Sequence, residues 1–380
     1  MNSGLIRHGK GREPSRRAFG GTLARLALAR LALTRLALTR LALAAGLAGG
    51  VLATGLLSPG VAVAAEKITI AALTFVSSSP LFIAQEKGYY ADEGLEVEFK
   101  FFRAAQPVAV AIASGDADFG VTAFTGGFYN LAAKGALRVI GAQSREEPGY
   151  DFSAYLVSNK AYDAGFTSVD RFPGHSFGMT QTGSSFHYMI GQLADKRGFD
   201  LSEISLKPLQ SVPAMIGALK SGQIDSIILP AHIAKGLDKA GVARIIGWVH
   251  QETPYQLGGL FTSAKNIAER RDMVEKFVRA YQRAAGDYSE GMNALDGDGK
   301  RLFGAKADAL IPLINKYVGP NPTPEKTKAG APFIDPMGRL DVGDIYQQVA
   351  WYQARGMVDK SLNPAEIIDL SFVEGHFNLP

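Results

Sequence analysis

An eight-residue pattern occurs twice in this chain. AIASGDAD at 111–118 returns as ALKSGQID at 218–225, so that A-x-x-S-G-x-x-D repeats after 107 residues. Each copy follows a proline suited to the first turn of a helix, contains a glycine suited to the helix end, and precedes a short apolar run typical of a buried strand. The repeated unit predicts two similar α/β lobes; a chance match of small residues is the alternative.

The rest of the chain alternates between predicted strands and helices, which is typical of parallel-rich sheets flanked by helices. The predicted strands are 67–73, 95–102, 119–121, 137–142, 154–157, 176–179, 204–208, 227–229, 243–248 and 257–262. The predicted helices are 81–93, a helix from TGSS to 198, 268–288, 305–317 and 341–355.

A helical C-terminal tail of this kind usually packs back on the first lobe. We therefore predict that lobe 1 comprises 66–152 and 262–380, and that lobe 2 comprises 153–261. The chain would then cross between the lobes twice, near 151–155 and near 255–260.

Residues 1–65 are predicted to be an export signal. Paired arginines at 16–17 precede Phe19, an uncharged apolar run covers 41–57, and AVAA at 62–65 precedes Glu66. This order is typical of a cleaved signal peptide, and the paired arginines resemble a twin-arginine signal. Regularly spaced arginines lengthen the basic region, and a transmembrane anchor over the 17 uncharged residues is the alternative.

Removing the predicted signal reverses the charge of the chain. Residues 1–65 hold nine of the 40 Lys and Arg residues and one of the 36 Asp and Glu residues, so 66–380 has 31 basic and 35 acidic residues and a net charge of −4. A nucleic-acid partner is therefore not expected. The sequence has no cysteine, which excludes disulfides, thiolate metal ligands and lipid attachment to an N-terminal cysteine. We expect a soluble protein in the periplasm without a lipid anchor.

Four stretches, taken in order and spacing, resemble one family. They are PLFIAQEKGYYADEGLEV (80–97), ASGDADFG (113–120), FGMTQTGSSFHY (177–188) and LKSGQID (219–225). From about Ile68 to Ala264 the chain is similar to the periplasmic substrate-binding proteins of ABC importers, in the branch for nitrate, taurine, sulfonates and thiamine-pyrimidine precursors. The resemblance implies a two-lobed periplasmic-binding-protein fold, a ligand cleft between the lobes, and a partner permease in the inner membrane. We expect a monomer without a cofactor.

Ligands of open α/β sheets lie at the carboxyl ends of the strands. Five loops meet that condition: 74–79, 103–106, 122–127, 181–187 and 230–232. The fourth contains TGSS at 182–185, whose small residues leave the first N–H groups of a predicted helix uncovered. Such an end stabilises an anion by about 0.3–1 kcal/mol. TGSS is expected to hold a carboxylate or sulfonate, with ordinary capping by Ser184 or Thr182 as the alternative.

The predicted ligand-binding residues come from these loops. They are Phe75, Ser77, Ser78, Arg103, Gln106, Phe124, Thr125, Thr182, Gly183, Ser184, Ser185, His187, Pro230 and His232. Arg103 is expected to pair with an anionic group, unless it is a solvated surface charge. The phenylalanines would line an apolar or aromatic ligand, unless they belong to the core. His187 matches a family histidine, whereas Ala231 and His232 replace a common acid and proline, which disfavours a ligand with an amino group.

The expected function is an exported receptor that captures a small organic anion, a sulfonate or carboxylate with aromatic ones among the candidates, and delivers it to an ABC permease. An enzyme is not expected. The absence of cysteine excludes the iron site of a pyrimidine-synthesising relative, and the six histidines lack metal-ligand spacing. A G-x-S-x-G nucleophile motif is also missing. A sensor receptor, an enzyme of the same fold and a binding protein for a neutral pyrimidine-type ligand are the alternatives.

Overall fold

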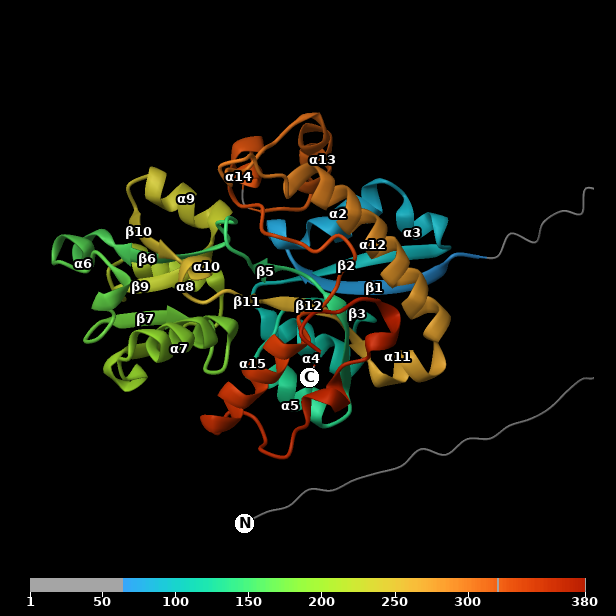
Figure 1. The fold of residues 1–380 in the computed structure, drawn as a ribbon, viewed down its shortest axis with the longest axis horizontal. Helices are drawn as coiled ribbons and strands as arrows, with labels where there is room; N and C mark the ends of the chain where they lie inside the picture. The colour runs from blue at the N-terminus through green and yellow to red at the C-terminus, as the bar shows by residue number, and fades with distance from the viewer. Residues whose placement is uncertain (1–63, 320, 380) are drawn as a thin grey trace, which may run out of the picture. The chain divides into compact units, whose positions relative to one another are not determined.

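Two five-stranded sheets form the framework of the protein (Figure 1). The computed structural model describes residues 64–319 and 321–379, so nearly all of the predicted export signal lies outside the described residues. The first sheet contains, in spatial order, β2 (Leu95–Phe102), β1 (Glu66–Leu73), β3 (Phe119–Ala123), β12 (Gly258–Ser263) and β4 (Leu137–Ala142). The second contains β8 (Ser205–Pro208), β7 (Ser176–Met179), β9 (Ser226–Pro230), β6 (Ser153–Ser158) and β10 (Ala243–Trp248).

The two sheets share one pairing scheme. In each sheet three strands pair in parallel, β2-β1-β3 and β8-β7-β9, and the other two strands are added by antiparallel pairing. The aspartates of the repeated pattern have equivalent partners: Asp118 accepts a hydrogen bond from the Thr69 amide (2.8 Å), and Asp225 accepts one from the Ser176 amide (2.9 Å). The predicted α/β fold is confirmed, and each sheet is mixed.

A glycine ends each helix of the repeated pattern. These helices are α4 (Ala105–Ser114) and α8 (Val212–Lys220), which precede β3 and β9. Gly115 and Gly222 follow with φ angles of 83° and 70°, a left-handed conformation that other residues adopt only with strain. β9 is buried along its whole length, as expected for a strand with a neighbour on each side.

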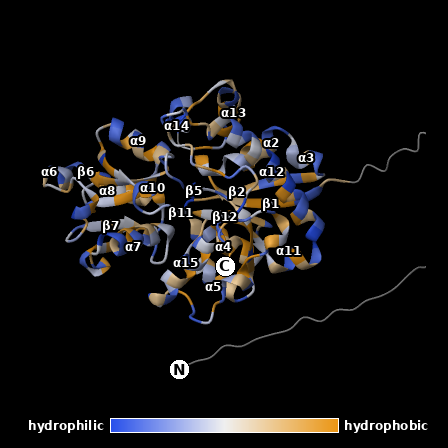
Figure 2. Ribbon diagram, in the orientation of Figure 1, coloured by the Kyte–Doolittle hydropathy of each residue, from blue (hydrophilic) through white to orange (hydrophobic). Residues whose placement is uncertain are grey.

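The other helices of the first three quarters of the chain flank the two sheets. They are α2 (Ser79–Glu86), α3 (Tyr89–Asp92) and α5 (Gly126–Ala133) beside the first sheet, and α6 (Asn159–Asp163), α7 (Ser185–Arg197), α9 (Ala231–Lys239) and α10 (Val249–Glu252) beside the second. The single helix predicted over 81–93 is wrong, because Gly88 adopts a φ of 76° and separates α2 from α3. Hydrophobic residues concentrate in the strands, and hydrophilic ones lie at the periphery (Figure 2).

The C-terminal helices contact both halves of the fold. They are α11 (Ala264–Glu269), α12 (Arg271–Met292), α13 (Ala305–Asn315), α14 (Pro324–Ala329) and α15 (Val342–Ala354), and short 3₁₀ turns occupy Val76–Ser78, Val169–Arg171, Leu201–Glu203, Pro364–Ile367 and Leu370–Phe372. α12 packs on α2, whereas α14 contacts α9. α15 reaches α7, where Trp351 Nε1 donates to Asp195 Oδ2 (2.9 Å). Within the part of the chain that the structure describes, no helix combines the length and apolar character needed to cross a membrane.

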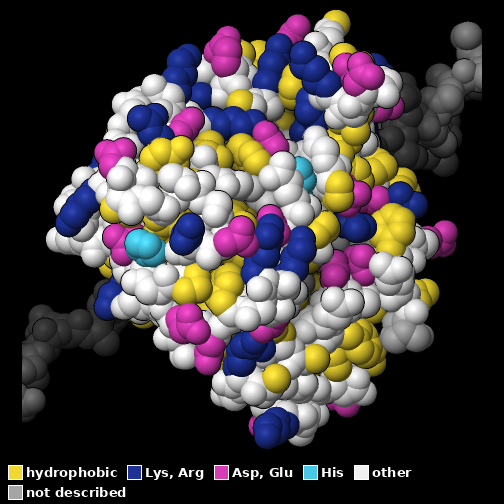
Figure 3. All heavy atoms as spheres, turned by 60° about the vertical axis from the view of Figure 1, so that its left-hand side comes forward, with side chains coloured by type: hydrophobic (Ala, Val, Ile, Leu, Met, Phe, Trp, Pro, Cys, Tyr) yellow, Lys and Arg dark blue, Asp and Glu magenta, His cyan; other side chains and the backbone are white. Residues whose placement is uncertain are grey.

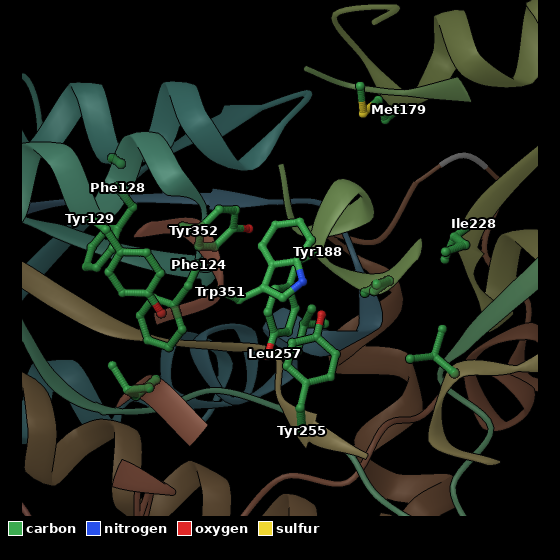
Figure 4. Close-up of a cluster of buried hydrophobic side chains, with 14 of the residues drawn as sticks. Phe124, Phe128, Tyr129, Met179, Tyr188, Ile228, Tyr255, Leu257, Trp351 and Tyr352 are labelled. Carbon is green, nitrogen blue, oxygen red and sulfur yellow. The ribbon is translucent and has the colours of Figure 1, made fainter. Parts of the chain in front are cut away.

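A two-stranded sheet lies between the two larger ones (Figure 1). It pairs β5 (Arg145–Glu146) with β11 (Tyr255–Gln256) in antiparallel fashion. Beside it, Tyr188, Tyr255, Trp351 and Tyr352 pack with ring centroids 5.1–5.7 Å apart (Figure 4). The hydrophobic core is therefore continuous from the first sheet to the second through α15.

Candidate functional site

A small cavity lies at the carboxyl ends of β1, β3, β4, β7 and β9. Its volume is about 50 Å³, enough for a few water molecules. The polar side chains that line it are Ser77, Ser78, Thr122, Gln143, Ser153, Thr180 and Ser185. The rest of the lining is apolar, and no charged side chain of the described residues contributes to it.

Three helices begin at this cavity without a capping side chain. They are α2, α4 and α9, whose N-cap residues are Ser78, Ala104 and Pro230, and each of these residues lines the cavity. A side chain commonly accepts a hydrogen bond from the first turn of a helix. Part of the first turn is nevertheless already satisfied: the Ser79 N–H donates to the Val76 carbonyl oxygen, the Ala231 N–H donates to the Phe152 carbonyl oxygen (2.7 Å), and Pro80 and Pro107 have no N–H. The positive ends of the three helix dipoles still lie at the cavity. The cavity therefore favours an anion although its lining is uncharged.

Ser78 brings an unpaired polar group to the cavity. The residue is 1 % exposed, and its hydroxyl oxygen has no hydrogen-bond partner among the described residues. A buried polar atom without a partner costs about 1–3 kcal/mol, so such atoms are rare and are expected where a ligand or an ordered water completes a site. Nearby, the Gln143 side-chain amide is fixed by donating to the Ser77 carbonyl oxygen (3.2 Å).

Five of the predicted ligand-binding residues line the cavity: Phe75, Ser77, Ser78, Ser185 and Pro230. Phe75 also borders a second space of about 780 Å³, which we call the outer groove. The predicted residues Arg103 and His232 line the outer groove and not the cavity. In this structure Arg103 and the TGSS turn therefore face different spaces.

The TGSS turn caps its own helix. Ser184 Oγ accepts a hydrogen bond from the His187 amide (3.3 Å), and His187 Nδ1 accepts one from the Gly183 amide (3.1 Å). Burial, followed by the nearby charge of Arg355, lowers the pKa of His187 to about 4. The imidazole is therefore neutral at pH 7 and carries its proton on Nε2, because Nδ1 acts as the acceptor.

The same turn also joins elements of the two sheets. The Gly126 amide at the start of α5 donates to the Gly183 carbonyl oxygen (2.8 Å). The Tyr352 hydroxyl of α15 donates to the Ser184 carbonyl oxygen (3.2 Å). Of the four TGSS residues, only Ser185 lines the cavity.

The remaining predicted residues line neither space. They are Gln106, Phe124, Thr125, Thr182, Gly183, Ser184 and His187. Thr125 caps α5 by accepting from the Phe128 amide (2.9 Å), and its hydroxyl donates to Gln106 (2.5 Å). Phe124 packs in the buried cluster drawn in Figure 4, and Thr182 is exposed.

Four polar residues at the cavity are not among the predicted ligand-binding residues: Thr122, Gln143, Ser153 and Thr180. Thr122 lies in the selected loop 122–127, whereas the other three lie outside the five loops. Gln143 and Thr180 directly follow the last residues of β4 and β7, so the rule that selected the five loops applies to them as well. Thr122 and Ser153 lie within β3 and β6. Whether their side chains reach the cavity depends on the face of the sheet on which each residue lies. The short apolar runs in the sequence do not indicate that face.

The chemistry available in the cavity consists of hydroxyl groups, one side-chain amide and backbone N–H donors. Its lining includes no histidine, carboxylate, lysine or arginine from the described residues, so no lining side chain titrates near neutral pH. Among residues 64–319 and 321–379, no three His, Asp or Glu side chains gather as metal ligands do. The arrangement is suited to holding a small polar or anionic group.

Comparison with known proteins identifies the fold and the family. The family model described as NMT1/THI5 like matches residues 76–290, and no curated protein matches the chain. The alkanesulfonate-binding protein SsuA from Xanthomonas axonopodis pv. citri, bound to MOPS, is 18 % identical, with 81 % of this chain and 100 % of that chain covered and a TM-score of 0.64. The periplasmic nitrate-binding protein NrtA from Synechocystis PCC 6803 is 13 % identical, with 80 % and 86 % covered and a TM-score of 0.62. A mutant of DszB in complex with biphenyl-2-sulfinic acid is 14 % identical, with 81 % and 97 % covered and a TM-score of 0.53.

These comparisons confirm the resemblance predicted from the four sequence stretches. At such low identity the solved structures show the fold alone, which is that of periplasmic binding proteins. The family model spans more than half of the chain and includes the polar cavity residues from Ser77 to Ser185. The chain belongs to the NMT1/THI5-like family.

Proposed function

We propose that this protein is an exported receptor that binds a small organic anion, a sulfonate or carboxylate, and delivers it to the permease of an ABC importer. The ligand site is the cavity between lobe 1 (66–152 and 262–380) and lobe 2 (153–261). Three uncapped helix N-termini around an uncharged cavity carry this proposal. Their dipoles supply partial positive charge, and no carboxylate of the described residues lines the cavity to repel an anion.

The contents of the cavity also favour binding over catalysis. Its side chains are hydroxyl, amide and apolar groups, so it lacks a side chain that could act as a general base at neutral pH. The unpaired Ser78 hydroxyl adds a donor for an oxyanion. Two structural neighbours, SsuA bound to MOPS and the DszB mutant bound to biphenyl-2-sulfinic acid, support sulfur oxyacids as candidate ligands for this fold.

The small size of the cavity supports opening and closure of the lobes around the ligand. A volume of about 50 Å³ is too small for most organic anions, so the lobes would have to move apart to admit one. The two chain crossings next to β5 and β11 supply a hinge for that motion. A ligand that contacts both lobes stabilises the closed form by its differential affinity for that form.

A thermal-shift screen with matched pairs of compounds tests this function. Each pair compares an anion with a neutral analogue of similar shape: methanesulfonate with dimethyl sulfone, benzenesulfonate with benzenesulfonamide, and benzoate with benzamide. Nitrate, taurine and thymine complete the set. A ligand of the folded state at 100 times its Kd stabilises by about 2.7 kcal/mol, which raises Tm by several degrees.

We expect at least one sulfonate or carboxylate to raise Tm while its neutral analogue leaves Tm unchanged. Taurine should be weaker than a sulfonate without an amine, because no acidic side chain of the described residues lines the cavity. Stabilisation by thymine alone, or equal stabilisation by both members of every pair, contradicts an anion receptor. Turnover of a bound compound, followed by mass spectrometry, would contradict a pure binding role.

A further inference from the structure

The outer groove has the size of a second ligand-binding site. Its volume is about 780 Å³, against about 50 Å³ for the cavity, and small-molecule sites span about 300–1,000 Å³. Phe75 and Val212 line both spaces and so form the wall between them. The Val212 amide donates to the Arg103 carbonyl oxygen (3.4 Å), which joins α8 to the loop after β2 at this wall.

The charge of the outer groove is positive. Arg103, Lys220 and Lys326 line it, and no acidic side chain of the described residues does. Within the same part of the chain, none of the three forms an ion pair with a carboxylate, and the Lys326 ammonium group donates to the Asn321 carbonyl oxygen (2.8 Å). Unpaired cations around a hollow attract an anion and raise its local concentration. Elsewhere the surface mixes both signs of charge with hydrophobic side chains, as the face in Figure 3 shows.

His232 adds an unpartnered polar group to the same groove. The residue is 6 % exposed, and neither ring nitrogen has a hydrogen-bond partner within the part of the chain that the structure describes. Its ring lies 5.5 Å from that of Phe75, centroid to centroid, on the groove side of the wall. Burial, followed by the charge of Lys326, lowers the pKa of His232 to about 3, so the ring offers one donor and one acceptor at neutral pH.

The walls of the outer groove are apolar. They include Phe102, Ile216, Ile233, Leu237 and Val318. We propose that the outer groove binds an amphipathic organic anion, an aromatic sulfonate or carboxylate too large for the cavity, with its acid group between Arg103 and Lys326 and its rings against these apolar side chains. This site is separate from the cavity and goes beyond the proposed function.

Fluorescence titration with 8-anilinonaphthalene-1-sulfonate tests this proposal, and N-phenyl-1-naphthylamine, which has the same rings without the sulfonate, is its control. The variant R103Q/K326Q keeps long polar side chains but removes two charges. It should weaken binding of the sulfonate at least tenfold and change binding of the neutral amine less than twofold. K134Q, which removes an exposed charge at the end of α5, should leave both probes unaffected. Raising the salt concentration should weaken only the sulfonate.

A second variant distinguishes the outer groove from the cavity. S78A/S185A alters two cavity residues and should leave the affinity for 8-anilinonaphthalene-1-sulfonate unchanged. If S78A/S185A weakens this probe and R103Q/K326Q does not, the probe occupies the cavity and the outer groove is not its site. Equal binding of the charged and neutral probes to the parent protein also overturns the proposal. Because Arg103 and Lys326 do not line the cavity, either result leaves the function proposed for the cavity standing.

Discussion

Ser78 connects the stability of the folded chain with ligand binding, because its hydroxyl is buried and has no partner. We predict that S78A leaves the ligand-free Tm unchanged or slightly higher, since the substitution removes an unsatisfied polar atom. Affinity for the anion found in the screen should fall by about 1.5–3 kcal/mol, the usual range for a hydrogen bond to a charged group. Isothermal titration calorimetry and thermal melts measure both quantities.

The control for S78A is S184A. Ser184 caps α7 and does not line the cavity, so its removal should cost about 1 kcal/mol of stability and leave affinity nearly unchanged. The reverse pattern, in which S78A destabilises the free protein and S184A abolishes binding, would show that the TGSS turn holds the ligand and Ser78 does not.

His187 gives a pH dependence with a defined sign. Its pKa in the folded protein is about 4, against 6.5 for an exposed histidine. Above pH 6.5 both states are neutral, so the full stability is present. As the pH falls below 6.5 only the unfolded chain binds the proton, and stability is lost at about 1.4 kcal/mol per pH unit until the folded pKa is reached.

We therefore predict that H187N loses about 2 kcal/mol less stability than the parent between pH 7 and pH 5. Asparagine keeps an acceptor for the Gly183 amide but cannot be protonated in this range. Urea unfolding at the two pH values gives the comparison, and other titrating groups cancel because both proteins contain them. Equal losses in parent and variant would mean that His187 is protonated in the folded state.

At the scale of elements, α15 holds α7 through close packing at a glycine. A Cβ at Gly191 would collide with the indole ring of Trp351. G191A should therefore destabilise the protein by about 1–3 kcal/mol. The matched control is G217A in α8, where a Cβ meets nothing within 4 Å, and it should stabilise by about 0.5–1 kcal/mol. If W351F does not restore part of the loss in G191A, the Trp351 contact is not its cause.

The sequence predicts helices and strands correctly where several local signals agree. The repeated pattern located β3 and β9 because proline, glycine and an apolar run all agree there. The helix predicted over 81–93 is interrupted at Gly88, which adopts the left-handed conformation. Glycine can adopt either a left-handed or a right-handed conformation, and the local sequence does not indicate which one it adopts here. The two-residue strands β5 and β11 carry too few residues to show a periodic pattern.

The candidate site is less predictable from the sequence than the fold. The rule that ligands lie at the carboxyl ends of strands predicted the region of the cavity and the outer groove. It did not predict which residues line the cavity and which line the outer groove. Arg103 and His232 follow strand ends, yet line the outer groove. Ser184 was selected as part of the TGSS helix start and His187 because it matches a family histidine, but the hydrogen bonds of both side chains are made within the α7 cap. Side-chain direction is set by packing across the fold, which local sequence does not contain.

For the whole molecule, the central claim is that two lobes close on an anion in the cavity. Small-angle X-ray scattering of the exported protein, with and without the anion found in the screen, tests it most directly. Because closure brings the two lobes together, the liganded protein should show a smaller radius of gyration than the ligand-free protein. An identical radius at saturating ligand would contradict closure and favour a rigid binding site.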